Sequence, residues 1–270
     1  MIRQLAAVVL AVFCAAPLWA DQTLDRLVKV LRLTDIIEVM HEEGLEYGDE
    51  LDELMLGGQG GPFWAGEVRR LHDRDRILAR VRKTLKSTLS NSEMTDSIRF
   101  FDNDRGQRLL ALEIAARQAM SDPAVEEAAW EQFELLEASG SDRHVAILRF
   151  VEVNDLLERN VDGGLRSQFM FSLGLAKGGQ SDWSRGEIAA ETRLQEASIR
   201  ETTHSWLMGF LTLAYGPVPQ DDLNAYVRFS ETPAGQALND SLFEGFNGVY
   251  QDLSFGLGLA AGGIIASDDL

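Results

Sequence analysis

The sequence predicts an all-α protein made of two related multi-helix halves, packed together as one elongated or bilobed molecule. Two observations support this fold class. Apolar residues recur three and four positions apart along the chain, which is the spacing of one helix face, and no alternating run with a hairpin signal interrupts them. A short motif also occurs twice, as IRFFDNDRGQRL over 98–109 and as VRFSETPAGQAL over 227–238.

Each copy of this motif joins the end of one predicted helix to the start of the next. Asn103 and Thr232 are the expected N-caps, and Pro233 suits a first helical position because its missing N–H has no partner there. We expect a structural role for the repeated residues. Glycine permits a close helix approach, glutamine bonds a neighbouring backbone, and arginine reaches an acidic partner across the junction. The repeated residues are Arg99, Phe100, Gly106 and Gln107 in the first copy, and Arg228, Phe229, Gly235 and Gln236 in the second.

Residues 1–20 have the pattern of a signal peptide. Arg3 supplies a positive charge, an apolar run follows over 5–16, and cleavage is expected after Ala20. Removal of this segment takes away Cys14, the single cysteine, and makes the net charge one unit more negative than the −18 of the full chain. So acidic a protein is a poor candidate for binding nucleic acid. We therefore expect a periplasmic or otherwise exported protein without a thiol.

The first repeat is assigned to 21–140. Its first helix is expected to start at a Thr23 cap and its second at a Thr34 cap, with Gly44 ending the second. A third helix over 45–55 should stop at the glycine-rich segment that follows it. Further expected features are one helical stripe over 68–85, a start at Ser92-Glu93, a helix from 109 to 120, and a helix from Pro123 closed by Gly140.

The second repeat is assigned to 141–270, where similar landmarks return in the same order. Residues 153–158 match 33–38, Gly178-Gly179-Gln180 matches 57–59, and Trp183 matches Trp64. The last helix is expected to run over 238–253, followed by the apolar tail FGLGLAAGGIIAS. Because that tail is short, no membrane span is expected in the mature chain.

The order of these segments resembles an exported bacterial family known as domain of unknown function 2059. The resemblance rests on 27–38 and 92–107 in the first half, and on 147–158 and 222–236 in the second. It implies an all-helical exported domain present as two divergent copies. Members of that family have no known activity, so the resemblance implies none here.

No set of residues in the sequence forms a catalytic, cofactor or metal site. The four histidines His41, His72, His144 and His204 are expected in surface or capping roles, since none has metal-ligand spacing. Asp102-Asn103-Asp104 departs from a calcium-loop pattern and is better explained by helix capping. The acidic cluster Glu42, Glu43, Glu46, Asp49, Glu50, Asp52 and Glu53 is expected on a solvated helix face.

Three functional hypotheses remain. The first is a non-enzymatic binding or interaction module of the cell envelope, whose partner is a protein or a small apolar ligand. Its site would be a seam between the halves or the segment 253–265. The second is an envelope-acting enzyme of unrecognised type that uses carboxylates. A carboxylate with a raised pKa in a deep pocket would favour it. The third is a periplasmic chaperone or stress-associated protein.

Overall fold

A computed structural model describes residues 16–179 and 182–268. The described chain is helical and contains no strand, which confirms the all-α prediction. The helices of the N-terminal half are α1 Ala16–Val30, α2 Leu33–Met55, α3 Gly61–Leu71, α4 Arg74–Thr88, α5 Asn91–Phe101, α6 Asp104–Ala119 and α7 Pro123–Ser139. Those of the C-terminal half are α8 Asp142–Val153, α9 Leu156–Gly178, α10 Arg185–Leu194, α11 Glu196–Tyr215, α12 Gln220–Ser230 and α13 Pro233–Asp268.

The two halves share several local features. α2 and α9 each have 23 residues, and each follows a non-glycine residue in the left-handed region, Arg32 with φ 53° and Asp155 with φ 52°. α5 and α12 each have 11 residues. The next helix in each half starts at the expected cap, where the side chains of Asn103 and Thr232 accept from the backbone N–H three residues later. α7 has the predicted limits, with Pro123 in its first turn and Gly140 as a left-handed C-cap.

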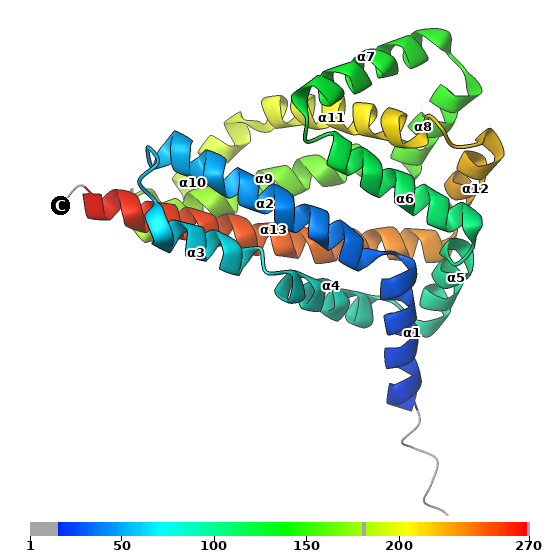
Figure 1. Cartoon of the computed structure of the whole chain (residues 1–270), viewed down its shortest axis with the longest axis horizontal. Coiled ribbons are helices and arrows are strands. Elements are labelled where there is room, and N and C mark those ends of the chain that lie inside the picture. The colour runs from blue at the N-terminus through cyan, green and yellow to red at the C-terminus, as the bar shows by residue number, and fades with distance from the viewer. Residues whose placement is uncertain (1–15, 180–181, 269–270) are drawn as a thin grey trace, which may run out of the picture.

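Helices from each half also pack on the other half (Figure 1). α13, from the C-terminal half, lies against α3, α4 and α5 as well as α9. α6, from the N-terminal half, packs on α11. Two apolar cores follow from this exchange: one joins α1–α5 with α13, and the other joins α6 with α8, α11 and α12.

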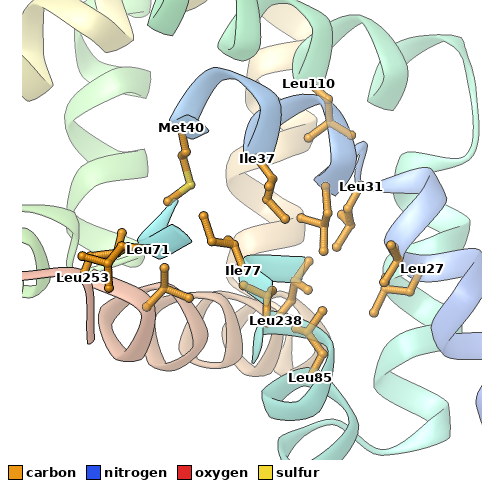
Figure 2. Close-up of a cluster of buried hydrophobic side chains, with 14 of the residues drawn as sticks. Leu27, Leu31, Ile37, Met40, Leu71, Ile77, Leu85, Leu110, Leu238 and Leu253 are labelled. Atoms are coloured by element: carbon orange, nitrogen blue, oxygen red, sulfur yellow. The ribbon is translucent and has the colours of Figure 1, made fainter. Parts of the chain in front are cut away.

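The larger core gathers the apolar stripes of helices that are distant in sequence (Figure 2). Leu27, Ile77 and Leu85 are at most 2% exposed. Leu238 and Leu253 of α13 are buried in the same core, so the C-terminal helix completes the packing of the N-terminal half. The segment 253–265 is therefore largely a core element.

α13 is a single helix of 36 residues and continues through the tail that we expected to follow it. By length and composition alone, it is the one helix in the described part that could cross a membrane. The core helix of a soluble protein meets the same criteria, so the expectation of no membrane span stays a prediction. Here it packs closely along α9. A Cβ on Gly258 would lie 2.1 Å from the Phe171 carbonyl oxygen, and one on Gly174 would lie 2.4 Å from that of Phe255. The glycines let the two backbones touch.

Several predicted boundaries in the N-terminal half are wrong. α1 starts at Ala16, within the expected signal peptide, rather than at a Thr23 cap. α2 begins after the left-handed Arg32, so Thr34 is not its cap, and it continues through Gly44 to Met55. Gly44 is needed for packing, because a Cβ there would lie 2.1 Å from the His72 ring.

Four further expectations also fail or fall outside the described chain. The stripe over 68–85 belongs to two helices, since Asp73 accepts from the Arg76 N–H and starts α4. α5 is capped by Ser90 in a capping box with Glu93, two residues before the predicted start. Trp64 is buried whereas Trp183 is 52% exposed, so the two are not matching landmarks. Gln180 lies outside the described residues.

Candidate functional site

The two copies of the motif contact each other near the ends of α5 and α12. The rings of Phe100 and Phe229 stack with centroids 4.2 Å apart and planes at 9°. The Phe101 ring packs edge-on against both of these rings, and the Tyr226 ring stacks on Phe100. The centroid distances in these contacts are all below 6 Å. Phe100 and Phe229 occupy matching positions in the two motif copies, so the two halves meet at this junction.

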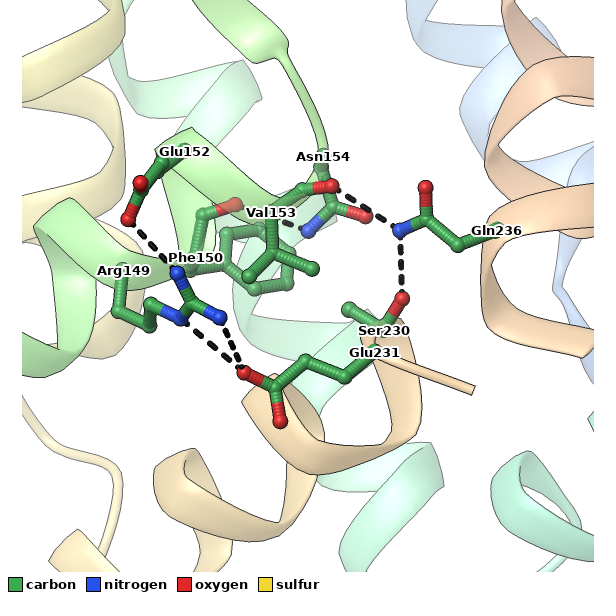
Figure 3. A network of polar contacts seen from close by, with 8 residues as sticks. All are labelled: Arg149, Phe150, Glu152, Val153, Asn154, Ser230, Glu231 and Gln236. Carbon is green, nitrogen blue, oxygen red and sulfur yellow. Dashed lines mark hydrogen bonds and ion pairs between the residues drawn. The ribbon is translucent and has the colours of Figure 1, made fainter. Parts of the chain in front are cut away.

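The motif glutamines tie three helix ends together in each half. Gln236 donates from Nε2 to the carbonyl oxygens of Val153, at 3.0 Å, and Ser230, at 2.6 Å (Figure 3). Gln107 donates in the same way to Val30, at 2.8 Å, and to Phe101, at 3.0 Å. These acceptors lie at helix C-termini, where carbonyl groups have no intrahelical partner.

The motif glycines are required by the same turn. A Cβ on Gly235 would lie 2.1 Å from the Phe229 carbonyl oxygen, and one on Gly106 would lie 2.4 Å from the Phe101 Cα. Both obstacles are backbone atoms of the preceding helix end, which no side-chain rotation can move. Only glycine therefore fits at either position.

The motif arginines do not cross the junction as expected. Arg99 pairs with Asp96 on its own helix, and Arg228 is exposed. Instead, Arg149 donates to Glu231 at 2.8 Å within the C-terminal half (Figure 3), and Arg26 donates to Asp102 within the N-terminal half. These arginines were missed because they lie in other helices, outside the motif.

A cavity of about 330 Å³ opens beside this junction. Its walls are mainly apolar, and they come from both halves. The N-terminal half contributes residues around the α1–α2 turn and from α5 and α6, while the C-terminal half contributes residues from α8, α9, α11, α12 and α13. The segment 253–265 does not line it.

Glu113 of α6 is the principal polar group in the cavity wall. The Tyr215 hydroxyl donates to its Oε1 at 2.6 Å, and the Tyr226 hydroxyl also hydrogen-bonds to its carboxyl group. Burial raises the pKa of Glu113 to about 7, although the two tyrosine hydrogen bonds favour the ionised form and lower it. The side chain keeps some exposed surface because it lines the cavity. This carboxyl group therefore changes its charge near neutral pH.

Arg117, one turn further along α6, is a second charged group in the wall. Glu43 of α2 accepts two hydrogen bonds from its guanidinium, at 2.9 and 2.6 Å, and the Tyr250 hydroxyl lies 3.0 Å from Nη2. Glu43 thus belongs to this pair rather than to a purely solvated acidic face. The fork-shaped contact neutralises the arginine within the protein.

The two charged groups of the cavity wall both come from α6, because α6 and α13 differ at corresponding positions. With the motif residues aligned, Glu113 corresponds to Leu242 and Arg117 to Phe246. All four line the cavity. The wall from α6 therefore carries the two charges, while the wall from α13 is uncharged and mainly apolar, with Asn239 as its polar side chain.

The other candidate residues lie outside this cavity. His72 and His144 are buried rather than on the surface: His72 Nδ1 donates to the Val68 carbonyl at 2.9 Å, and His41 bonds to the His72 carbonyl at 2.8 Å. His204 packs against Trp130. Among the described residues, no group of three or more His, Cys, Asp or Glu side chains is placed to hold a metal ion.

The fold and the cavity define an all-helical protein with an internal, mostly apolar cavity at the junction of its halves. Residues 75–131 match the sequence profile of a family described as an uncharacterised protein conserved in bacteria, DUF2059. The matched stretch contains the first motif copy together with Glu113 and Arg117, and the second copy lies outside it. No curated protein and no solved structure matches the chain.

Proposed function

We propose that this protein is an exported, non-enzymatic binding protein, and that its cavity holds a small, mainly apolar ligand. The cavity beside the Phe100–Phe229 stack carries this proposal. Its volume of about 330 Å³ is within the usual range for small-molecule sites, which combine apolar walls with a few placed polar groups. The one-sided placement of Glu113 and Arg117 suits a ligand with one polar end.

We also infer that the two halves arose by duplication. The paired motifs, the equal lengths of α2 and α9, and the left-handed residues before both helices support this origin. The reciprocal packing of α6 and α13 on the opposite halves supports it further. On this view the cavity formed where two equivalent surfaces met, and substitutions on α6 and α13 then made it asymmetric. The pattern of residues 1–20 supports export to the periplasm.

The test is native mass spectrometry of the chain 21–270, purified gently after secretion into the periplasm. We expect a reproducible additional mass that is lost on denaturation. A Leu242→Trp variant fills the cavity and should lose that mass, whereas Leu259→Trp, on the exposed part of the same helix, should keep it. A bare chain that also binds no alkyl probe by calorimetry would refute the binding function.

One observation favours the enzyme hypothesis as a second candidate. Glu113 has its pKa raised by burial to about 7 and lines a cavity, which is the arrangement of a general acid or base. If the bound ligand is chemically altered over time by the wild type but not by Glu113→Gln, the protein is an enzyme. If it is recovered unchanged from both, the binding function stands.

A further inference from the structure

We propose that the ligand carries a protonated amine on an apolar body and that Glu113 receives the amine. This inference rests on the proposed binding function and specifies the ligand class of the same cavity. It follows from the charge balance of the cavity, the rings around Glu113, and the apolar wall opposite.

The charge balance leaves one carboxylate without a counter-ion. Within the described chain, no Arg, Lys or His nitrogen lies within 4.0 Å of the Glu113 carboxyl group. Arg117 does not serve, because its charge is paired with Glu43, which accepts from Nε and Nη2. When Glu113 is ionised, the cavity therefore has one excess negative charge, and a cationic ligand is the partner that neutralises it.

Aromatic rings surround the same carboxyl group. Tyr215 and Tyr226 bond to it directly, and the Phe150 ring lies 5.5 Å from the Tyr215 ring and 4.7 Å from the Tyr226 ring. All three residues line the cavity. Ring faces attract ammonium groups but give nothing to an anion, so these rings add to the preference for an amine.

The opposite wall determines the rest of the ligand. Leu238, Leu242 and Phe246 of α13 offer only hydrocarbon surface to the cavity. A ligand that spans from Glu113 to these side chains gains from an apolar body, although the Asn239 amide also lines the cavity. A carboxylate head is disfavoured, because it would meet the Glu113 charge while the Arg117 charge is already balanced by Glu43.

The experiment compares three probes that share one alkyl chain: octylamine, octanol and octanoate. Each is titrated by calorimetry into the protein 21–270 at about pH 8, because Glu113, with its pKa of about 7, is mostly ionised there. We expect octylamine to bind at least about tenfold more tightly than octanol, since a hydrogen bond between two charged groups is stronger than one to a neutral head. Octanoate should bind most weakly. In Glu113→Gln the amine should lose its advantage while octanol binds unchanged. Glu42→Gln, at an exposed position of α2, is the control and should behave as wild type.

The outcomes separate the two proposals. If octanol or octanoate binds as tightly as octylamine, the cavity binds ligands but the amine inference is wrong. The same holds if Glu113→Gln keeps the amine preference. If no probe binds and no native ligand is found, the binding function itself fails. Should Glu113→Gln not fold, the ranking of the three probes on the wild type decides alone.

Discussion

The Glu113 carboxyl group makes a specific prediction about stability and pH. A carboxyl group with a higher pKa in the folded chain than in the unfolded chain binds more protons in the folded state. The free energy of unfolding therefore falls as the pH rises from the pKa of the unfolded chain to that of the folded chain, and the loss is complete above the higher pKa. The Glu113 pKa rises from an ordinary 4.5 to about 7 on folding. By linkage, ionisation of this group costs about 3 kcal/mol of the free energy of unfolding near pH 8 and under about 1 kcal/mol near pH 5.

Glu113→Gln isolates this cost because glutamine has nearly the same shape and stays neutral. We expect the variant to be more stable than wild type near pH 8, with an advantage about 2–3 kcal/mol larger than near pH 5. Urea unfolding of both proteins at the two pH values, at equal ionic strength, measures this difference. Taking the difference between the proteins removes the general effect of the negative net charge. A variant–wild-type difference that does not change with pH would refute the raised pKa.

Other parts of the structure yield three further predictions. Gly235→Ala should lower the free energy of unfolding by about 3 kcal/mol, because its Cβ would lie 2.1 Å from a backbone oxygen. The control Gly66→Ala has nothing within 4 Å of its new Cβ and should be neutral or gain up to about 1 kcal/mol of stability, so equal effects of the two in thermal unfolding would contradict this prediction. Gln236→Ala should cost about 1–3 kcal/mol by leaving two carbonyls unpaired, against little change for the exposed Gln118→Ala in the same urea assay. Deletion of 254–270 removes Leu257 and other α13 residues from the larger core, so circular dichroism should show loss of cooperative unfolding; a truncated chain that unfolds at the wild-type temperature would argue against this packing.

Local sequence signals predicted the elements best where a cap or a proline sets the helix end. Pro123 and Gly140 delimit α7, and Asn103 and Thr232 start α6 and α13. They failed where a tertiary contact decides. Gly44 has the usual character of a helix stop, yet α2 continues through it because the His72 ring requires the space of its missing side chain. A contact between distant segments leaves no local signal in one sequence.

The candidate site was less predictable than the fold. The motif pointed to the junction, and the structure places Phe100, Phe229 and both glutamines there. Glu113 was overlooked, although it is the one charged residue in the apolar stretch LLALEIAA over 109–116. An isolated acid in such a stretch is a usable signal of a buried carboxyl group. Its tyrosine partners come from α11 and α12, about a hundred positions later, so their meeting could not be foreseen.

The exchange of α6 and α13 between the halves also governs when the chain can fold. The N-terminal half contains most residues of the larger core, but Leu238, Leu253 and Leu257 must arrive before that core closes. A chain leaves the ribosome, or would pass through a translocation channel, with its N-terminus first. The α13 residues that complete this core are therefore missing until nearly all of the chain has emerged. The topology therefore delays completion of the core until late in synthesis, and the chain stays unfolded enough to pass through a narrow channel until then. During this long interval its apolar surface is exposed to chaperones or proteases.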